Sequence, residues 1–216
     1  MKRMLAVVLV LLLVMGSFAG CGSGGSGGEA EEESKVIKVG VFEPVTGENG
    51  GGGFQEVLGI RYANVVYPTV DIGGETYTIE LVEVDNKSDK TEAVTAAQRL
   101  ISEGVVAVIG SYGSGVSIAA GDIFAAAQVP AVGASCTNPQ VTAGNDFYFR
   151  VCFLDPFQGT VMANYAIQNG AKTAAVITQL GDDYSSGLGA YFVEEFNRLA
   201  GEGAVVSEQQ FQTNQT

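Results

Sequence analysis

The sequence contains no histidine and no tryptophan, and only three cysteines among its 216 residues. Without histidine the chain lacks the commonest general base and the commonest transition-metal ligand, so no Ser-His-acid triad can form within it. Three cysteines are too few for a zinc site of four thiolates in one chain. Cations are also scarce: 11 Lys and Arg face 24 Asp and Glu, a formal net charge of −13. This balance argues against nucleic acid and against an anionic membrane surface as partners.

The first 35 residues predict an export signal followed by a tether. Lys2 and Arg3 precede an apolar core and a small-residue exit, which is typical of a signal peptide over residues 1–20. A transmembrane helix is the alternative, but the apolar stretch of about 16 residues is shorter than the ~20 needed to span a bilayer. Residues 21–35 are rich in Gly, Ser and Glu, so we expect a flexible, solvated tether.

From residue 36 onward, apolar runs typical of buried strands alternate with stretches of helical periodicity. The four consecutive glycines within Gly47–Gly53 predict a loop, and Asp89 with Glu92 predicts a capping box ahead of a helix. Repeated β-α units imply a mostly parallel sheet with helices on both faces, an α/β fold. Strands are expected over 36–42, 76–84, 105–109, 129–132, 147–153, 173–178 and 204–211, and helices over 54–66, 93–101, 117–127, 158–169 and 185–199.

Two short stretches rich in hydroxyl groups follow neighbouring predicted strands. They are GSYGSGVS at Gly110–Ser117 and GASCTNP at Gly133–Pro139. Ligands of open α/β sheets bind beyond the carboxyl ends of the strands, where hydroxyls and free helix N–H groups suit a carboxylate. Neither stretch carries Lys or Arg, which favours a small zwitterion over a phosphate. Turn formation alone is the other explanation of these residues, and composition leaves it open.

Two other patterns were candidates for chemistry and are not favoured. Ser117 lies in Gly-Val-Ser-Ile-Ala, which misses the G-x-S-x-G motif at its last position and falls within a predicted helix. The adjacent carboxylates of Asp182 and Asp183 are candidates for metal ligands, but a pair before a helix more often interacts with the helix dipole. No catalytic residue, metal site or cofactor is therefore predicted.

The segments VVAVIGSYGSG, VPAVGASCTNPQVT and FYFRVCFLDPFQGT together resemble the type I periplasmic-binding-protein family, in particular its leucine/isoleucine/valine-binding branch. The resemblance extends from about Lys35 to Thr216. It implies two Rossmann-like lobes with mostly parallel sheets: lobe 1 over residues 36–153 and the start of lobe 2 over residues 154–216. It further implies an N-terminal fragment in which lobe 1 is incomplete and lobe 2 is truncated.

The same resemblance implies ligand-binding roles for four residues. Ser114 and Thr137 match residues whose hydroxyl and N–H groups hold the α-carboxylate headgroup. Ser135 matches a position whose backbone carbonyl accepts from the α-ammonium, and Tyr184 matches a tyrosine that reaches the site from lobe 2. Gly50–Gly53 stands where relatives place an aromatic residue against the ligand side chain, so the resemblance does not fix side-chain specificity.

The three cysteines have separate expected roles. Cys21, directly after Ala-Gly, looks like a bacterial lipoprotein cleavage site, which implies a lipidated thiol that anchors the protein. Cys136 and Cys152 either pair in a disulfide, which an extracytoplasmic compartment permits, or remain buried free thiols.

These observations predict an extracytoplasmic protein, lipid-anchored to the bacterial cell membrane, that performs no chemistry. The resemblance implies that it captures a branched-chain or other aliphatic amino acid in a cleft between the lobes. It would deliver this ligand to the permease and ATPase subunits of an ABC importer. The alternative is an extracellular ligand-sensing domain of a signalling receptor.

Overall fold

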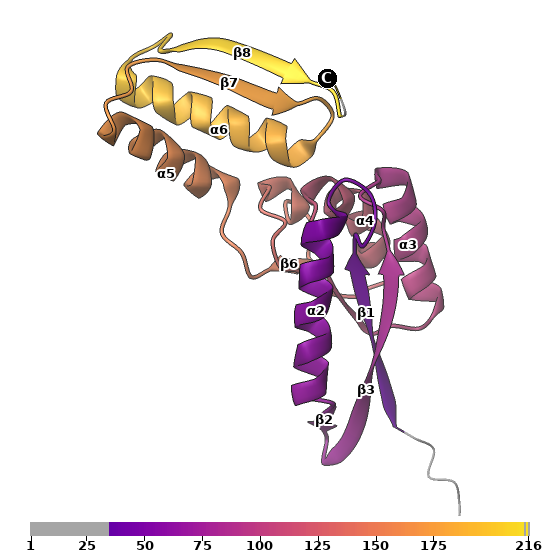
Figure 1. Ribbon diagram of the computed structural model, residues 1–216. Helices are drawn as coiled ribbons and strands as arrows, with labels where there is room; N and C mark the ends of the chain where they lie inside the picture. The colour runs from indigo at the N-terminus through magenta and orange to yellow at the C-terminus, as the bar shows by residue number, and fades with distance from the viewer. Residues whose placement is uncertain (1–34, 214, 216) are drawn as a thin grey trace, which may run out of the picture. The chain divides into compact units, whose positions relative to one another are not determined.

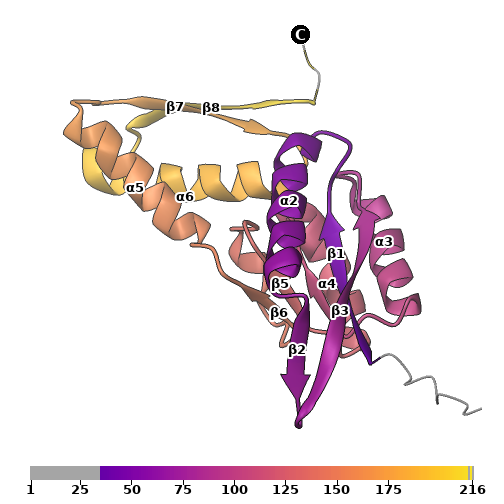
Figure 2. The same ribbon diagram turned by 60° about the horizontal axis from the view of Figure 1, so that its bottom comes forward.

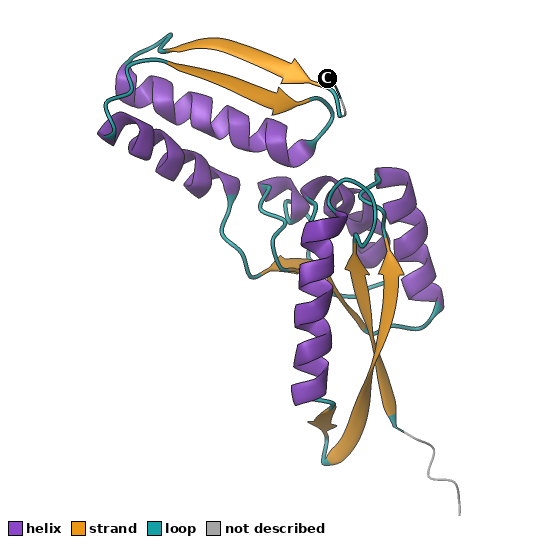
Figure 3. Cartoon of the chain, in the orientation of Figure 1, coloured by secondary structure: helices purple, strands orange, loops and turns teal. Residues whose placement is uncertain are grey.

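The computed structural model describes residues 35–213 and residue 215, along which strands and helices alternate (Figure 1, Figure 3). Eight strands form two sheets: β1 (Val36–Glu43), β2 (Thr69–Ile72), β3 (Glu75–Asp85), β4 (Ala107–Ile109), β5 (Ala131–Gly133) and β6 (Tyr148–Arg150) in one, β7 (Ala174–Gln179) and β8 (Val205–Phe211) in the other. The larger sheet has the order β2-β3-β1-β4-β5-β6, and only its β2–β3 pair is antiparallel. The predicted α/β fold with mostly parallel sheets is confirmed.

Five α-helices accompany the strands of the described residues, and three of them cover the two faces of the larger sheet. They are α2 (Gly50–Val66), α3 (Lys90–Ser102), α4 (Ser114–Ala126), α5 (Asp155–Gln168) and α6 (Asp183–Ala200), with a short 3-10 helix, η2 (Pro139–Val141). Helices α3 and α4 pack together on one face of the larger sheet, and α2 lies on the other (Figure 1, Figure 2). Helix α6 lies against β7, and α5 packs on α6 (Figure 2). The sequence therefore predicted the alternation correctly, although it did not predict β2.

The main core lies between the larger sheet and the α3–α4 pair. Phe42 from β1, Leu100 from α3 and Phe124 from α4 are fully buried there. The rings of Phe42 and Phe124 meet edge to face, with centroids 5.5 Å apart. Burial of each such side chain contributes about 1.5–3 kcal/mol, so this layer holds the carboxyl ends of the strands in place.

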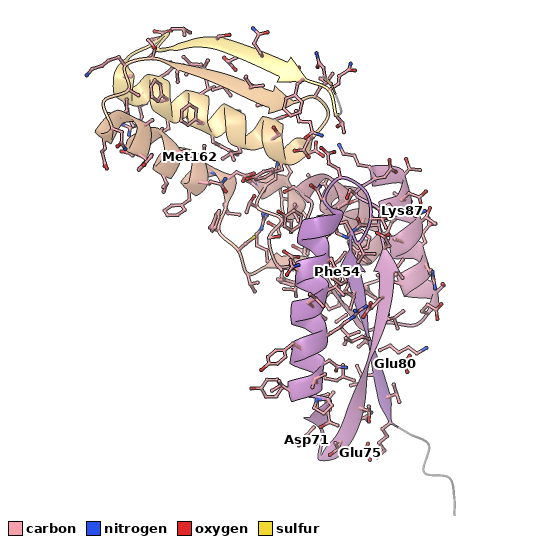
Figure 4. The ribbon with its side chains drawn as sticks, in the orientation of Figure 1. Phe54, Asp71, Glu75, Glu80, Lys87 and Met162 are labelled. Atoms are coloured by element: carbon pink, nitrogen blue, oxygen red, sulfur yellow. The ribbon has the colours of Figure 1, made fainter. Side chains whose placement is uncertain are left out.

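Helix α3 has the N-cap that the sequence predicted, but Glu92 pairs with Lys87 at 3.1 Å and does not complete the predicted capping box. Asp89 is its N-cap, and its carboxylate accepts hydrogen bonds from the N–H groups of Thr91 at 2.8 Å and Glu92 at 2.9 Å. Two of the helix's unpaired N–H groups are satisfied in this way. Figure 4 shows Lys87 near this point, at the carboxyl end of β3, whereas Asp71 and Glu75 lie at the opposite end, at the β2–β3 turn.

The loop predicted over Gly47–Gly53 is wrong in its second half. Gly50–Gly53 form the first turn of α2, although glycine is a poor helix former. The reason is close packing: a Cβ on Gly53 would lie 2.1 Å from the Pro44 carbonyl oxygen. Only glycine lets the helix backbone approach β1 this closely, so tertiary contact overrides local propensity.

Several predictions about the ends of the chain and its lobes remain predictions. The signal peptide, the tether and Cys21 lie outside the described residues. The two sheets belong to segments before and after residue 154, but the lobe boundary itself is not tested. Across residues 35–213, no helix is both long enough and apolar enough to cross a membrane.

Candidate ligand-binding site

A cavity of about 340 Å³ lies beyond the carboxyl ends of β4 and β5. Ser114, Ser135 and Tyr184, three of the four predicted ligand-binding residues, line this cavity, whereas Thr137 does not. The lining carries two carboxylates, Glu48 and Asp182, and no Lys or Arg. The complete lining consists of Glu48, Asn49, Tyr112, Gly113, Ser114, Ser135, Gln179, Asp182, Tyr184 and Ser185.

Ser114 is the first residue of α4, directly after its N-cap Gly113. The side chain is only 2 % exposed, and its Oγ accepts a hydrogen bond from the Asn138 N–H at 3.3 Å. Because Oγ acts as an acceptor in this contact, the hydroxyl proton is free to donate elsewhere. The N–H groups of the first helical turn also have no intrahelical partner. This end of the cavity therefore offers several neutral donors to an anion.

Thr137 lies beneath the lining, against the segment that leads to α5. Its Oγ1 is buried and forms no hydrogen bond of normal geometry, and neither does either carboxylate oxygen of Asp155. The backbone joins the two residues, because the Asp155 N–H donates to the Thr137 carbonyl at 3.1 Å. Burial raises the pKa of Asp155, while the Thr137 hydroxyl and the Arg150 guanidinium oppose that rise. Asp155 carried no recognisable sequence signal.

Arg150, at the end of β6, fixes the loop that carries Thr137. Its guanidinium donates to the carbonyls of Cys136 at 2.9 Å, Asn138 at 2.7 Å and Pro139 at 3.2 Å. A planar fork of five donors suits such a cluster of carbonyls better than a lysine ammonium would. The sequence did not indicate this role, because Arg150 lies in a predicted strand, 13 residues after Thr137.

A buried acidic pair supports two of the lining residues from below. Glu43, at the end of β1, is 1 % exposed, and its Oε2 accepts from the Tyr112 N–H at 2.7 Å. Glu56 from α2 accepts from the Ser135 hydroxyl. The remaining oxygens, Glu43 Oε1 and Glu56 Oε2, are buried and unpaired. Burial, and then the neighbouring Glu56 charge, raise the pKa of Glu43 to about 10.

Glu43 is therefore protonated at neutral pH and has a proton to donate to Glu56. A shared proton would link the loop after β4 to the loop after β5. The Ser135 hydroxyl is already used, because it donates to Glu56. The Ser135 backbone carbonyl, which the resemblance assigns to the ligand, is therefore the candidate acceptor for the ligand's ammonium group. The sequence signal for the pair was an acid directly after the apolar run from Val39 to Phe42.

The other wall of the cavity comes from β7 and the start of α6. Tyr184, in the first turn of α6, is 38 % exposed, and its hydroxyl accepts from the Gln158 amide at 3.0 Å. Asp182 caps the helix by accepting from the Ser185 N–H at 2.7 Å. Asp183 pairs with Lys90 of α3 at 2.7 Å. Asp182 thus serves the helix N-terminus, as the sequence indicated for both carboxylates, whereas Asp183, in the first turn of α6, pairs with Lys90.

Of the two alternatives for Cys136 and Cys152, the disulfide is not formed in the structure, where both cysteines are free. Cys136 is fully buried, and its Sγ lies 2.1 Å from the place of a Cβ on Gly133, so the thiol points into the core. Cys152 is only partly buried. Burial also raises the pKa of the Cys136 thiol to about 11, which makes it a poor nucleophile. The alternative of a buried free thiol describes Cys136.

Comparisons with known proteins identify the family of the chain. A sequence profile described as periplasmic binding protein matches residues 36–216. Leu/Ile/Val-binding protein homolog 2 of Brucella abortus is 32 % identical over 181 residues, which are 81 % of this chain and 48 % of that protein. The chain thus spans about half the length of the relatives it matches.

Solved structures give the same result. The leucine binding protein LivK of Thermotoga maritima is 41 % identical, with a TM-score of 0.74 over 82 % of this chain and 49 % of that one. The branched-chain amino acid transporter substrate binding protein LivJ of Streptococcus pneumoniae, in complex with isoleucine, is 30 % identical. Its TM-score is 0.72, and the match covers 84 % of this chain and 51 % of that one.

Proposed function

This chain belongs to the periplasmic binding protein family, and from that premise we propose that it captures an amino acid in the 340 Å³ cavity for an ABC importer. Lobe 1 (residues 36–153) would supply the headgroup contacts, and the segment from residue 154 would close over them. The protein would perform no chemistry on its ligand. A cleft of polar groups would desolvate the zwitterion, and hinge closure would retain it.

The observation that carries this proposal is the start of α4. Ser114 presents a free hydroxyl proton beside the unpaired N–H groups of a helix N-terminus, and it does so in the cavity wall. Such neutral donors suit a carboxylate that arrives with its own ammonium group. The Ser135 carbonyl and the nearby carboxylates Glu48 and Asp182 suit that ammonium. Thr137 would act on the same headgroup through its loop.

The ligand we propose is an amino acid with a branched-chain or other aliphatic side chain. The relatives named above bind leucine, isoleucine or valine by their descriptions, which supports this class. The two carboxylates of the lining disfavour acidic side chains.

The decisive experiment is calorimetry of the intact protein against leucine, isoleucine, valine, alanine and glutamate. Replacing Ser114 with Ala removes a hydrogen bond to a charged group, which is worth about 1.5–3 kcal/mol, so leucine affinity should fall roughly ten- to a hundredfold. Thr137→Val should cause a similar loss. The matched control is Ser102→Ala, since Ser102 is exposed at the end of α3 and bonds only the Arg99 carbonyl. Affinity unchanged in both site variants would contradict the assignment.

The location of the protein is a separate proposal. Family membership and the pattern ending in Cys21 support an extracytoplasmic protein held to the cell membrane by a lipid on that cysteine. Replacing Cys21 with Ala should abolish incorporation of labelled fatty acid and release the protein from the membrane fraction. Equal partitioning of parent and variant into detergent would contradict the anchor.

A further inference from the structure

The ring of Tyr112 is packed directly against the backbone of α2 at Gly52. A Cβ on Gly52 would lie 2.5 Å from Cζ, 2.7 Å from Cε2 and 2.9 Å from Cε1 of that ring. Three ring atoms at such similar distances mean that the hydroxyl-bearing half of the ring covers the glycine. No real Cβ is found this close to three carbon atoms, so the contact requires glycine at position 52.

Both partners of this contact are held in place from behind. On the helix side, a Cβ on Gly53 would be 2.1 Å from the Pro44 carbonyl oxygen, so α2 is already packed as closely as glycine allows. On the loop side, the Tyr112 N–H donates to the buried Glu43 carboxyl group at 2.7 Å. Neither the helix nor the loop backbone has room to retreat, and a larger residue at position 52 would displace the ring itself.

Tyr112 also lines the candidate ligand cavity, together with Gly113 and Ser114, and remains 40 % exposed. One part of its ring contacts Gly52, and the exposed part is available to a ligand. It is an aromatic residue of the lining and stands two residues before Ser114, at the headgroup donors of α4. A ligand whose carboxylate binds at Ser114 would bring its side chain close to this ring.

We propose that Gly52 and Tyr112 form an interlock that sets which side chains the cavity accepts, with the ring as the apolar wall against the ligand side chain. This inference rests on the proposed function and deepens it: the preferred ligand is an amino acid with an uncharged aliphatic side chain. Gly52 determines specificity although it has no side chain, because it determines where the ring lies.

The test compares two neighbouring glycines of the same helical turn. Gly52→Ala forces the ring toward the cavity, whereas Gly51→Ala is a matched control because nothing lies within 4 Å of a Cβ at Gly51. Calorimetry with leucine and alanine should show that Gly52→Ala weakens leucine binding at least tenfold and alanine binding clearly less. Gly51→Ala should leave both affinities within twofold of the parent.

A double-mutant cycle identifies the ring as the cause. In a Tyr112→Ala background the clashing atoms are gone, so adding Gly52→Ala should change the leucine affinity by no more than twofold and should raise the melting temperature as Gly51→Ala does. In the parent background, Gly52→Ala should lower the melting temperature relative to Gly51→Ala. The melting temperatures are measured without ligand, so they test the contact between Gly52 and Tyr112 even if the protein binds no amino acid.

The possible failures are distinguishable. If the parent binds none of the amino acids, the proposed function is wrong and the role in selectivity is overturned with it. If the parent binds leucine but Gly52→Ala weakens leucine and alanine equally, the function stands and the selectivity role is overturned. If Tyr112→Ala does not suppress the effect of Gly52→Ala on melting, the interlock itself is overturned.

Discussion

Ionisation of Glu43 lowers the free energy of unfolding, because the folded protein buries this carboxyl group. Its pKa is raised to about 10, chiefly by burial, whereas an unfolded chain ionises near pH 4.5. Between these values the unfolded state has lost a proton that the folded state keeps, so the free energy of unfolding falls as pH rises. Stability from this group is complete below about pH 4.5 and is lost progressively up to about pH 10.

Glu43→Gln should remove this pH dependence. The amide keeps an acceptor for the Tyr112 N–H and a donor for Glu56, yet it cannot ionise. We expect the variant to match the parent near pH 4.5 and to be more stable by up to about 5 kcal/mol at pH 8. Urea unfolding across this range measures the difference. Glu80→Gln is the control, since Glu80 is an exposed residue of β3 (Figure 4), and a similar gain there would contradict the assignment to Glu43.

Arg150 acts on the site through the loop it holds. Arg150→Lys keeps the charge but removes the fork that reaches the carbonyls of Cys136, Asn138 and Pro139. Loss of two or more such bonds should lower the unfolding free energy by about 2–3 kcal/mol and weaken ligand binding as the Thr137 loop loosens. Arg99→Lys on the exposed end of α3 is the control. A variant with parent-like melting and affinity would show that the fork is dispensable.

At the scale of elements, the glycine run of α2 gives a stability test that needs no ligand. Gly51→Ala places a methyl group in open space within a helix and should stabilise the protein by about 0.5–1 kcal/mol. Gly53→Ala places it 2.1 Å from the Pro44 carbonyl and should destabilise by about 1–3 kcal/mol. Thermal unfolding of the two variants should therefore move in opposite directions. A shared direction would mean that the helix start is not packed on β1.

Helix α2 was predicted from the sequence only in part. Periodicity predicted α2 from Phe54, which Figure 4 places on that helix. The preceding glycines were wrongly predicted as a loop because their packing partners, Pro44 and Tyr112, meet them only in the folded protein. Local sequence rules predict helix starts such as Asp89, because the cap and its hydrogen-bond donors are close together in the sequence. They do not predict packing partners that come together only when the sheet folds.

The sequence likewise indicated some residues of the candidate site and not others. The two stretches that contain Ser114 and Ser135 were predicted because strand ends and helix starts are readable from apolar runs followed by small polar residues, whereas the roles of the two serines came from the resemblance. Glu43 and Arg150 were missed because each is an isolated charged residue whose partners come from other elements. Resemblance contributed Tyr184, which spacing alone would have left as a surface residue at a helix start.

At the scale of the whole molecule, several contacts join the first 153 residues to the segment that follows them. Lys90 Nζ lies 2.7 Å from Asp183 Oδ2 and 3.3 Å from the Gly181 carbonyl. The Gln179 amide donates to Glu48 at 2.9 Å, beside the cavity. Residues contributed by both segments line that cavity, so contacts of this kind favour the arrangement in which a ligand is enclosed.

Lys90 therefore should affect how long a ligand stays bound more than how fast it enters. The Lys90–Asp183 pair is half-exposed, with side chains 51 % and 37 % accessible, and such pairs are worth about 0.2–1 kcal/mol. We expect Lys90→Met to raise the dissociation constant for leucine by about 1.5- to 5-fold, mostly through faster release. Stopped-flow release measured at low and high salt provides the check, because screening should weaken the parent more than the variant.

Lys87→Met is the matched control. Lys87 pairs at 3.1 Å with Glu92, which belongs to the same segment, so its loss should leave release unchanged. Equal effects of the two substitutions would mean that overall charge, rather than the contact between the two segments, governs retention.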